Sequence, residues 1–473
     1  MFPSKKTKII ATIGPASQSV PMLEQIINNG MNVARINFAH GDYATHAQTI
    51  ANIRQAATNT GQRVAIMGDL PGPKMRIGEL STPTVQLQSG QPFTLQTAPT
   101  IGDQFQASLD FDALATAFKP GDRIYMNDGY IQLEVQQVTE AALHCTVVVG
   151  GELRARKGVN FPGIDLGISA FTAHDQELLH FCAEQKVDAV SQSFVQGPED
   201  ILAVRTAAAM LNYYPFIIAK LERAETIENL DQILQVVDGI MVARGDLGVE
   251  IPIEKVAIVQ KQMIRQANRY GKPVITATHM LESMITNRRP TRAEATDVAN
   301  AILDGTDCVM LSGETAIGSF PDEAVAMMAR IAQVAEAEGT VNDAIEALIA
   351  GEGAGQKLSL EDRTALSVYH SAHELAPVII FTPTNTGATA RRLARFKLST
   401  WIVAFSIHEA TCQQLQFSYG VCPEHVNTLP PFWENYARHW CEIHNIVGQL
   451  ALLTEGTSRI RSGGTTRISI LYL

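Results

Sequence analysis

Short apolar runs recur along the first two thirds of the chain, and amphipathic stretches separate most of them. The runs are rich in β-branched and aliphatic residues, whereas the stretches between them have helical spacing. The runs predict strands at Lys8–Ile13, Val33–Phe38, Val64–Leu70, Ala189–Phe194, Phe216–Leu221, Gly239–Val242, Val274–Ala277 and Cys308–Leu311. The helices predicted between them include Met22–Asn29, Thr226–Val237, Ile253–Tyr270 and Arg292–Leu303. Short buried strands that alternate with helices form parallel sheets. Eight such strands favour a closed (β/α)₈ barrel, and a doubly wound open sheet is the alternative.

The alternation stops between Pro71 and about Asn160. This stretch predicts separate β segments, with turns at Pro120–Asp122 and Asn127–Gly129. The segments are Thr84–Gln88, Pro92–Gln96, Arg123–Met126, Ile131–Val138 and Leu143–Val149. We interpret residues 71–160 as a small β-barrel domain inserted between two parts of the (β/α)₈ barrel, residues 1–70 and 161–345. Because such an insert lies at the active-site end of a barrel, it can act as a lid.

A further domain is predicted at the C-terminal end. Gly351–Gln356 is rich in glycine and reads as a linker. Beyond it the alternation returns, with strands at Val378–Thr382, Trp401–Phe405 and Thr466–Leu471 and a helix at Thr389–Phe396. We therefore expect residues 350–473 to form an α/β domain of their own.

The composition narrows the class of protein. Of the 473 residues, 46% are hydrophobic and 18% are charged, which is typical of a packed globular chain. The net charge of −11 argues against a nucleic-acid partner. No apolar stretch approaches the ~20 residues that cross a bilayer, and Met1–Lys6 does not resemble a signal peptide. The six cysteines contain no CxxC pair, so we expect reduced thiols and a cytoplasmic protein without a membrane partner.

Polar residues stand at the carboxyl ends of most predicted strands. They are Arg35, Asn37, Asp69, Ser193, Lys220, Glu222, Arg244, Asp246, Thr278, Ser312 and Glu314. In a barrel these strand ends meet at one mouth, where polar residues are functional rather than structural. The set therefore predicts an active site, although each residue alone is equally consistent with a satisfied polar group at a strand end.

The residue types in this set indicate phosphoryl transfer. Glu222 and Asp246 offer two hard carboxylates for a Mg²⁺ ion that retains water and substrate oxygens. Lys220 and Arg35 can bind an anion beside the metal, and phosphoryl transfer depends on this positioning and charge neutralisation. Gly245–Gly248 precedes a helical stretch, so its N–H groups can hold a carboxylate.

Several segments of the chain match one family closely. They are Lys6–Pro15, Gly30–Gly41, Lys157–Gly163, Ala219–Glu222, Met241–Glu250, Pro273–Thr278, Met280–Met284, Pro290–Glu294 and Leu311–Thr315. In these segments the chain resembles the pyruvate kinases, and the matches cover the whole predicted barrel. The resemblance implies transfer of the phosphoryl group of phosphoenolpyruvate to ADP, giving pyruvate and ATP in the last step of glycolysis. It also implies a homotetramer.

The resemblance implies roles for the residues at the mouth of the barrel. Lys220 would stabilise the transferring phosphoryl group, and Glu222 and Asp246 would hold Mg²⁺ or Mn²⁺, with a second ion arriving on the nucleotide. The substrate would contact Arg35 through its phosphate and Gly245, Asp246 and Thr278 through its carboxylate, with Ser193 nearby. The nucleotide would contact Asn37, His40, Arg76, Lys157 and, on the lid, Asp128. Thr278 would protonate the enolate, with Ser312 and Glu314 relaying protons through water.

The chain departs from the family pattern at the monovalent-cation site. Relatives that need K⁺ carry Ser, Thr and Glu where this chain has Ala39, Leu70 and Lys74. Asn37, Asp69 and the Leu70 carbonyl remain as oxygen ligands. We expect the Lys74 ammonium to pair with Asp69 and replace the ion, so that K⁺ is not required. The alternative is that Lys74 points to solvent and K⁺ still binds.

A second anion site is predicted in the C-terminal domain. Its residues resemble the sugar-phosphate effector loop of regulated relatives: Thr382, Thr384, Asn385, Thr386, Gly387, Thr389 and, on a facing segment, Arg461. Such a loop can bind phosphate at a helix N-terminus. The effector would be a hexose bisphosphate, another sugar monophosphate or AMP. The alternative is an ordinary helix cap with a solvated basic face.

Two rival functions differ in the residues they require. A metal-dependent aldolase, or a phosphotransferase that does not use ADP, would keep Glu222 and Asp246 but would have less need for Lys220, Arg76, Lys157 and the lid. A non-catalytic effector-sensing protein would predict loss of Lys220, Glu222 or Asp246, and all three are present.

Overall fold

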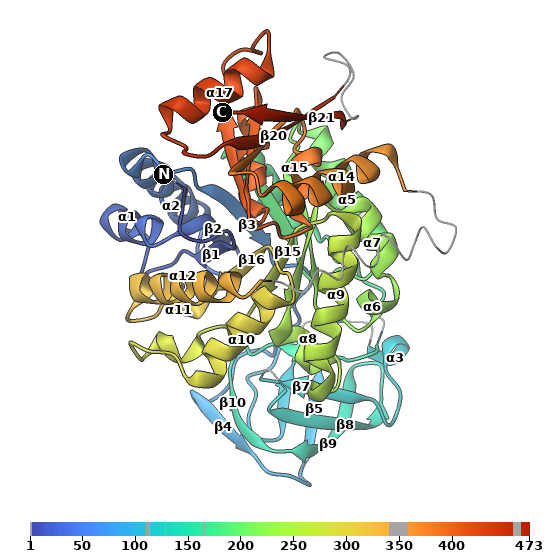
Figure 1. The fold of residues 1–473 in the computed structure, drawn as a ribbon. Helices are drawn as coiled ribbons and strands as arrows, with labels where there is room; N and C mark the ends of the chain where they lie inside the picture. Colours follow the sequence, from blue (N-terminus) through green and yellow to red (C-terminus); the bar gives the residue numbers. More distant parts are fainter. Residues whose placement is uncertain are drawn as a thin grey trace.

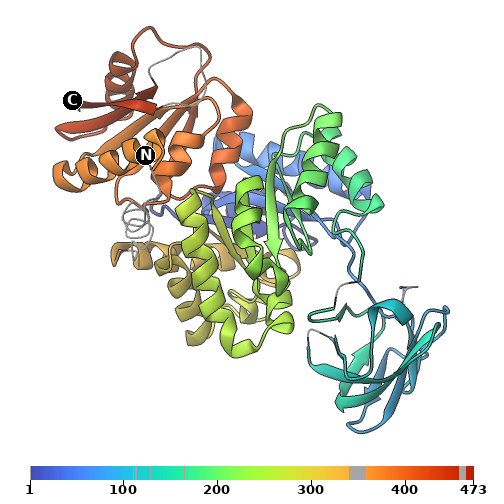
Figure 2. The ribbon, with the colours of Figure 1, turned by 90° about the vertical axis from the view of Figure 1, so that its right-hand side faces the viewer.

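The computed structural model describes residues 2–109, 111, 114–127, 129–164, 166–339, 358–456 and 465–473. The chain forms a barrel, an inserted lid and a C-terminal α/β domain, and the barrel separates the other two (Figures 1 and 2). Asp128, Arg461 and the predicted linker Gly351–Gln356 lie outside the described residues.

Eight parallel strands close the barrel in the order β1-β16-β15-β14-β13-β12-β3-β2. Their bounds are β1 (Lys8–Thr12), β2 (Met31–Asn37), β3 (Ala65–Leu70), β12 (Ala189–Gln192), β13 (Phe216–Leu221), β14 (Gly239–Ala243), β15 (Val274–Ala277) and β16 (Cys308–Leu311). Every residue of β1, β3, β12, β14, β15 and β16 is buried, because side chains pack both inside the barrel and under the helices. This burial explains the continuous apolar runs. The predicted barrel is confirmed, and the open sheet was the wrong alternative.

Helices surround the barrel (Figure 1). Their bounds are α1 (Val20–Asn28), α2 (Tyr43–Thr60), α4 (Ala173–Glu184), α5 (Pro198–Met210), α6 (Glu225–Glu228), α7 (Leu230–Val236), α8 (Arg244–Glu250), η1 (Ile253–Lys255), α9 (Val256–Tyr270), η2 (Glu282–Ile285), α10 (Arg292–Leu303), α11 (Gly313–Ala316) and α12 (Pro321–Ala337). Capping boxes start α4 at Thr172 and α10 at Thr291. The helix predicted at Thr226–Val237 is two short helices that meet at Asn229.

The lid is a twisted β domain with its own apolar core. A six-stranded sheet runs in the order β11-β7-β8-β9-β5-β6, and β10 pairs with β4. The elements are β4 (Thr84–Leu87), β5 (Pro92–Gln96), β6 (Gln106–Ser108), α3 (Leu114–Ala117), β7 (Arg123–Met126), β8 (Ile131–Val138), β9 (Ala142–Val149), β10 (Gly151–Arg154) and β11 (Val159–Asn160). Two adjacent connections join it to the barrel, as Figure 2 shows.

The C-terminal domain is a five-stranded sheet with helices on both faces. Its strands run in the order β19-β18-β17-β20-β21, and only β21 is antiparallel to its neighbour. The elements are α14 (Leu360–Leu375), β17 (Ile379–Pro383), α15 (Ala388–Ala394), β18 (Trp401–Ser406), α16 (Glu409–Gln414), η3 (Leu415–Phe417), β19 (Val421–His425), α17 (Trp433–Ile443), β20 (Leu450–Gly456) and β21 (Thr465–Tyr472). Helices α14 and α15 cover one face and α17 the other.

The C-terminal domain closes the bottom of the barrel with an aromatic side chain. Phe417 is fully buried among the residues that fill the barrel interior, and its ring stacks on Phe216 at 5.3 Å between centroids. Beside it, the Lys397 ammonium lies 2.7 Å from Asp307 in a buried ion pair between the two domains. The C-terminal domain is therefore packed into the base of the strands whose other ends carry the candidate site.

The structure also shows the state of the cysteines and whether any helix could cross a membrane. All six cysteines are free thiols. Among the described helices, none combines the length and apolar character that a membrane crossing requires.

Candidate active site

A cavity of about 410 Å³ opens at the carboxyl ends of the barrel strands, next to the first lid connection. Most of the predicted site residues line it: Arg35, Asn37, His40, Asp69, Lys74, Arg76, Ser193, Lys220, Glu222, Asp246, Thr278 and Ser312. Leu70, Lys157, Gly245 and Glu314 are not among its lining residues. The barrel topology thus gathers side chains that are far apart in the sequence.

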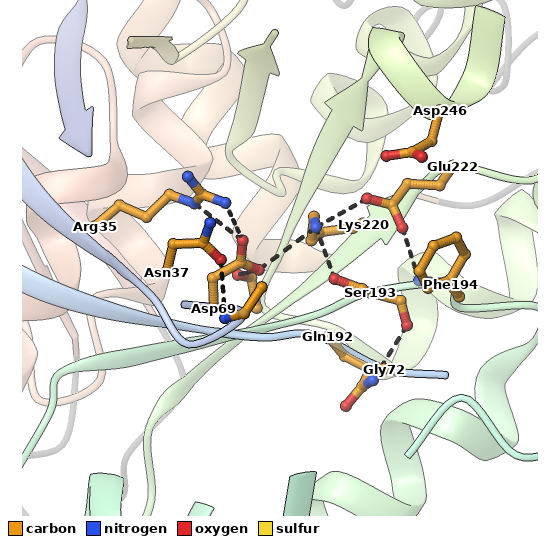
Figure 3. Close-up of polar contacts among 12 residues, drawn as sticks. Arg35, Asn37, Asp69, Gly72, Gln192, Ser193, Phe194, Lys220, Glu222 and Asp246 are labelled. Atoms are coloured by element: carbon orange, nitrogen blue, oxygen red, sulfur yellow. Dashed lines mark hydrogen bonds and ion pairs between the residues drawn. The ribbon is translucent and has the colours of Figure 1, made fainter. Parts of the chain in front are cut away.

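Lys220 stands at the centre of the polar contacts in the cavity (Figure 3). Its Nζ lies 2.8 Å from Glu222 Oε1, 2.6 Å from Ser193 Oγ and 3.5 Å from Asp69 Oδ1. Burial alone would lower the pKa of Lys220, but the charges of Asp69 and Glu222 raise it above its ordinary value. Lys220 is therefore a fixed positive charge at neutral pH.

Asp69 is a buried carboxylate that orients the two cations of the cavity, Arg35 and Lys220. Arg35 donates to its Oδ2 from Nε at 2.9 Å and also from Nη2, and Ser191 Oγ donates to its Oδ1 at 2.6 Å. Burial tends to raise the pKa of Asp69, but Lys220, Arg35 and the Ser191 bond together lower it. Asp69 remains ionised and fixes both cations for an incoming anion.

Glu222 and Asp246 supply the carboxylates of a candidate metal site. Both line the cavity, on the same side of Lys220 (Figure 3). The backbone N–H of Phe194 donates to Glu222 Oε2 at 2.8 Å, which orients the carboxylate. Burial raises the pKa of Glu222, and the nearby Asp246 charge raises it further, although Lys220 opposes both. A divalent cation would relieve this repulsion between like charges, so the residues fit a metal ion.

The two carboxylates would leave room for other ligands on such an ion. Within the described residues, no group of three or more His, Cys, Asp or Glu side chains lies close enough to hold a metal by itself. A pair of carboxylates is the protein share expected for Mg²⁺, whose other ligands are waters and substrate oxygens.

Lys74 forms an ion pair with a different carboxylate from the one predicted. Its Nζ is 3.2 Å from Asp246 Oδ1 and 5.9 Å from the centre of the Phe194 ring. We expected a pair with Asp69, but Arg35, Lys220 and Ser191 already occupy that carboxylate. The extra cation therefore neutralises a metal-ligand candidate.

Thr278 is held in an uncommon backbone conformation at the end of β15. Its φ is +68° and that of His279 is +53°, the left-handed region that costs a β-branched residue energy. The Thr278 carbonyl accepts from Arg244 Nη2 at 2.8 Å, and Arg244 in turn pairs with Asp297 at 2.7 Å. These contacts hold the strained peptide.

The Thr278 hydroxyl is connected to the start of α8. Its Oγ1 accepts from the Gly245 N–H at 2.7 Å and donates to the Ala277 carbonyl at 2.6 Å. The Gly245 N–H was expected to bind the substrate carboxylate. In this conformation it is hydrogen-bonded to Thr278 instead.

Glu314 and Lys157 were predicted as site residues, but they do not line the cavity. Glu314 is fully buried, and its oxygens accept from the Leu281 N–H at 3.0 Å and the Ser312 N–H at 2.7 Å. It therefore supports the wall that carries Ser312. Lys157 lies on the second lid connection, where its carbonyl accepts from the Ile77 N–H at 3.0 Å.

The predicted effector loop joins β17 to α15. Thr382 is fully buried, Thr384 Oγ1 accepts from the Gly387 N–H at 2.9 Å, and Gly387 has a φ of +78° that suits glycine. Arg391 Nη2 donates to the Thr386 carbonyl at 2.7 Å. Thr389 Oγ1 meets Thr465 Oγ1 at 2.6 Å, so the loop lies against the start of β21. Asn385 contributes its carbonyl to Thr411 at 2.7 Å.

Sequence reasoning missed several residues of the cavity. Phe194, His174, Met241 and Met310 line it without having been predicted. Phe194 has a φ of +57°, which aims its N–H at Glu222. Its position directly after Ser193 was a signal for the site, but an aromatic residue gives no sign of a left-handed backbone.

The barrel and its cavity define a phosphotransferase, because fixed cations for an anion stand beside a carboxylate pair under an inserted lid. Comparison with known proteins gives the family. A model of the pyruvate kinase barrel domain matches residues 4–325, and a model of the pyruvate kinase alpha/beta domain matches residues 362–471. The chain belongs to the pyruvate kinase family, and as a phosphotransferase of this family it acts on phosphoenolpyruvate and ADP.

Individual relatives agree with this assignment. The chain is 48% identical to a pyruvate kinase of Thermococcus litoralis over 89% of each chain. It is 43% identical to pyruvate kinase 2 of Synechocystis over 98% of this chain and 79% of the relative. The crystal structure of a pyruvate kinase from Cryptosporidium parvum superposes with a TM-score of 0.90 at 34% identity, covering 99% of this chain and 96% of that one.

Proposed function

We propose that Lys220, Arg35, Glu222 and Asp246 carry out the phosphoryl transfer. The observation that supports this most strongly is the position of Lys220, which lies 2.8 Å from Glu222 in the cavity and shares Asp69 with Arg35. The phosphate of phosphoenolpyruvate would bind Lys220 and Arg35, with Ser193 beside it. A Mg²⁺ or Mn²⁺ ion held by Glu222 and Asp246 would neutralise charge on the phosphoryl oxygens.

The remaining roles are those that membership of the family implies for the other side chains. Thr278, Gly245 and Asp246 would hold the substrate carboxylate, which would take over the Gly245 N–H that now meets Thr278. The nucleotide and its own metal ion would contact Asn37, His40 and Arg76 on the cavity wall, together with Lys157 and Asp128 of the lid. Thr278 would give a proton to the enolate, with Ser312, supported by Glu314, ordering water next to it.

The variant Lys220→Met tests the catalytic assignment. Removing the central cation should lower kcat for ATP formation by about 10³-fold or more, as expected when an electrostatic stabiliser of a transition state is lost. The KM values should change far less, and the unfolding temperature should stay near that of the wild type. A kcat within tenfold of the wild type would contradict the proposed role.

The enzyme is also proposed to work without K⁺. Lys74 supplies a fixed ammonium beside Asp246, and Ala39 and Leu70 lack the side-chain oxygens that a K⁺ site would use. Asn37, Asp69 and the Leu70 carbonyl are the oxygens left, and Asp69 is already neutralised by Arg35 and Lys220.

Activation by an effector at the C-terminal domain is a further part of the proposal. The loop of Thr382, Thr384, Asn385, Thr386, Gly387 and Thr389 precedes α15, and Arg461 would approach it from a facing segment. A hexose bisphosphate, another sugar monophosphate or AMP would fit such a loop. A homotetramer and a cytoplasmic location are likewise expected from the family.

A further inference from the structure

Next to the two lid connections, which together form the hinge of the lid, lies a partly buried carboxyl group that has no assigned catalytic role. Glu250 ends α8, the short helix that also carries Gly245 and Asp246. Its Oε2 is buried and has no hydrogen-bond partner among the described residues. Buried polar atoms are almost always paired, so an unpaired carboxylate oxygen needs an explanation.

Glu250 faces the strand by which the chain returns from the lid. The Asn160 side chain hydrogen-bonds its carboxyl group, and Asn160 is itself buried. Asn160 pairs through its backbone with Tyr125 of the lid sheet, and the neighbouring Val159 N–H donates to the Met75 carbonyl of the outgoing connection at 3.0 Å. Through Asn160, Glu250 therefore links α8 to the connection that returns from the lid, and the backbone pairs of Asn160 and Val159 join that connection to the lid sheet and to the outgoing connection.

A small cavity of about 40 Å³ separates these elements. Its walls include Pro73, Met75, Asn160, Phe194, Arg223 and Glu250. The volume is large enough for a water molecule, which could serve the unpaired oxygen. Gly129, in the turn between β7 and β8 next to β11, also lies close to α8, because a Cβ placed on it would stand 3.4 Å from Val249 Cγ2.

We propose that Glu250 is a positioning residue that fastens the hinge of the lid to α8 and so sets how readily the lid closes over the nucleotide. Through this contact the lid hinge is connected to α8, the same short helix that carries the metal-ligand candidate Asp246. Its role would be in the binding of ADP rather than in the chemical step.

The charges around Glu250 make the contact dependent on pH. Burial raises the pKa of the Glu250 carboxyl to about 7, from an ordinary value of 4.5. The Arg223 guanidinium and the Asn160 bond lower it, whereas the Glu225 and Asp246 carboxylates raise it. The packed hinge thus favours the protonated form, and a hydrated hinge would favour the ionised one.

The direction of the effect follows from this difference. A group whose pKa is raised in the packed state stabilises that state at low pH, and the contribution is lost as pH rises through the raised value. For a pKa of about 7, the packed hinge weakens about tenfold between pH 6 and pH 8. Because the packed hinge favours lid closure over the nucleotide, the KM for ADP should rise as pH increases from 6 to 8.

The variant Glu250→Gln separates the charge from the hydrogen bond. Glutamine is isosteric, can still accept from Asn160, and stays neutral. The ratio of the wild-type KM for ADP to that of Glu250→Gln should therefore increase about three- to tenfold from pH 6 to pH 8, while kcat stays within about twofold. The matched control Glu254→Gln removes an exposed carboxylate four residues further on and should show a flat ratio.

Glu250→Ala removes both the charge and the bond. We expect a KM for ADP about tenfold higher at pH 6, together with faster amide hydrogen exchange in a peptide that spans Val159 and Asn160. The exchange measurement needs no turnover, so it tests the hinge even if the proposed catalytic roles are wrong. A flat wild-type to Glu250→Gln ratio, or unchanged exchange in Glu250→Ala, would overturn the proposal. If Glu250→Ala does not fold, the pH dependence of Glu250→Gln decides.

Discussion

Replacing Lys74 by glutamate should convert the enzyme into one that requires K⁺. The ammonium lies 3.2 Å from Asp246 Oδ1, and the two side chains are 30% and 23% exposed. At this separation the attraction is about 1 kcal/mol at the dielectric constant of water and about 5 kcal/mol at the effective value of about 20 near a protein surface. We take about 2 kcal/mol for this partly exposed pair, and the variant also adds a repelling charge beside Asp246.

A loss of about 2 kcal/mol corresponds to about 30-fold in rate. Lys74→Glu should therefore be at least about 30-fold less active than the wild type in tetramethylammonium buffer. Added K⁺ should restore most of the activity, because a bound cation would again offset the carboxylates. The assay is ATP formation at saturating substrates and Mg²⁺, with Lys74→Met as a neutral comparison. Equal activity of wild type and Lys74→Glu without K⁺, or strong stimulation of the wild type by K⁺, would refute the reasoning.

Two further predictions concern the C-terminal domain. Phe417→Ala should lower the free energy of unfolding by about 3–5 kcal/mol, because it leaves a cavity where the ring stacks on Phe216 at the bottom of the barrel. Urea denaturation measures this loss, and Phe432→Ala is the control because Phe432 is 67% exposed. Titration of the wild type with a hexose bisphosphate, a sugar monophosphate and AMP should show one that lowers the phosphoenolpyruvate concentration needed for half-maximal rate. Replacing Thr386 and Thr389 of the proposed loop by alanine should abolish that response without changing the activity measured in the absence of effector, and an unchanged response in this variant would place the effector elsewhere.

The barrel and many residues at its mouth could be predicted because the sequence pattern of each strand is local. Buried parallel strands leave continuous apolar runs, and the barrel brings all their carboxyl ends together, so Arg35, Lys220 and Asp246 could be assigned to one cavity before any coordinates. The C-terminal domain was predicted less completely, because α14, α17, β19 and β20 were not assigned, although α17 is strongly amphipathic.

Other features depend on tertiary contacts that a sequence does not show. Lys74 was paired with Asp69 because K⁺-requiring relatives carry Glu at its position, but two other cations compete for Asp69, and only the fold shows this. Glu314 was predicted to relay protons through water with Ser312, and nothing in the sequence indicated that its carboxylate also accepts from two backbone N–H groups. Phe417 is one aromatic residue at the end of the short helix η3, and nothing in the local sequence indicates that it fills the barrel.

The most direct test of the central claim is ATP formation from phosphoenolpyruvate and ADP with Mg²⁺, measured with tetramethylammonium and then with K⁺ as the only monovalent cation. We predict equal rates in the two buffers, which would establish the reaction and the role of Lys74 as an internal cation. Activity only with K⁺ would contradict that role, and no ATP in either buffer, even with sugar phosphates and AMP added, would contradict the assignment of the reaction itself.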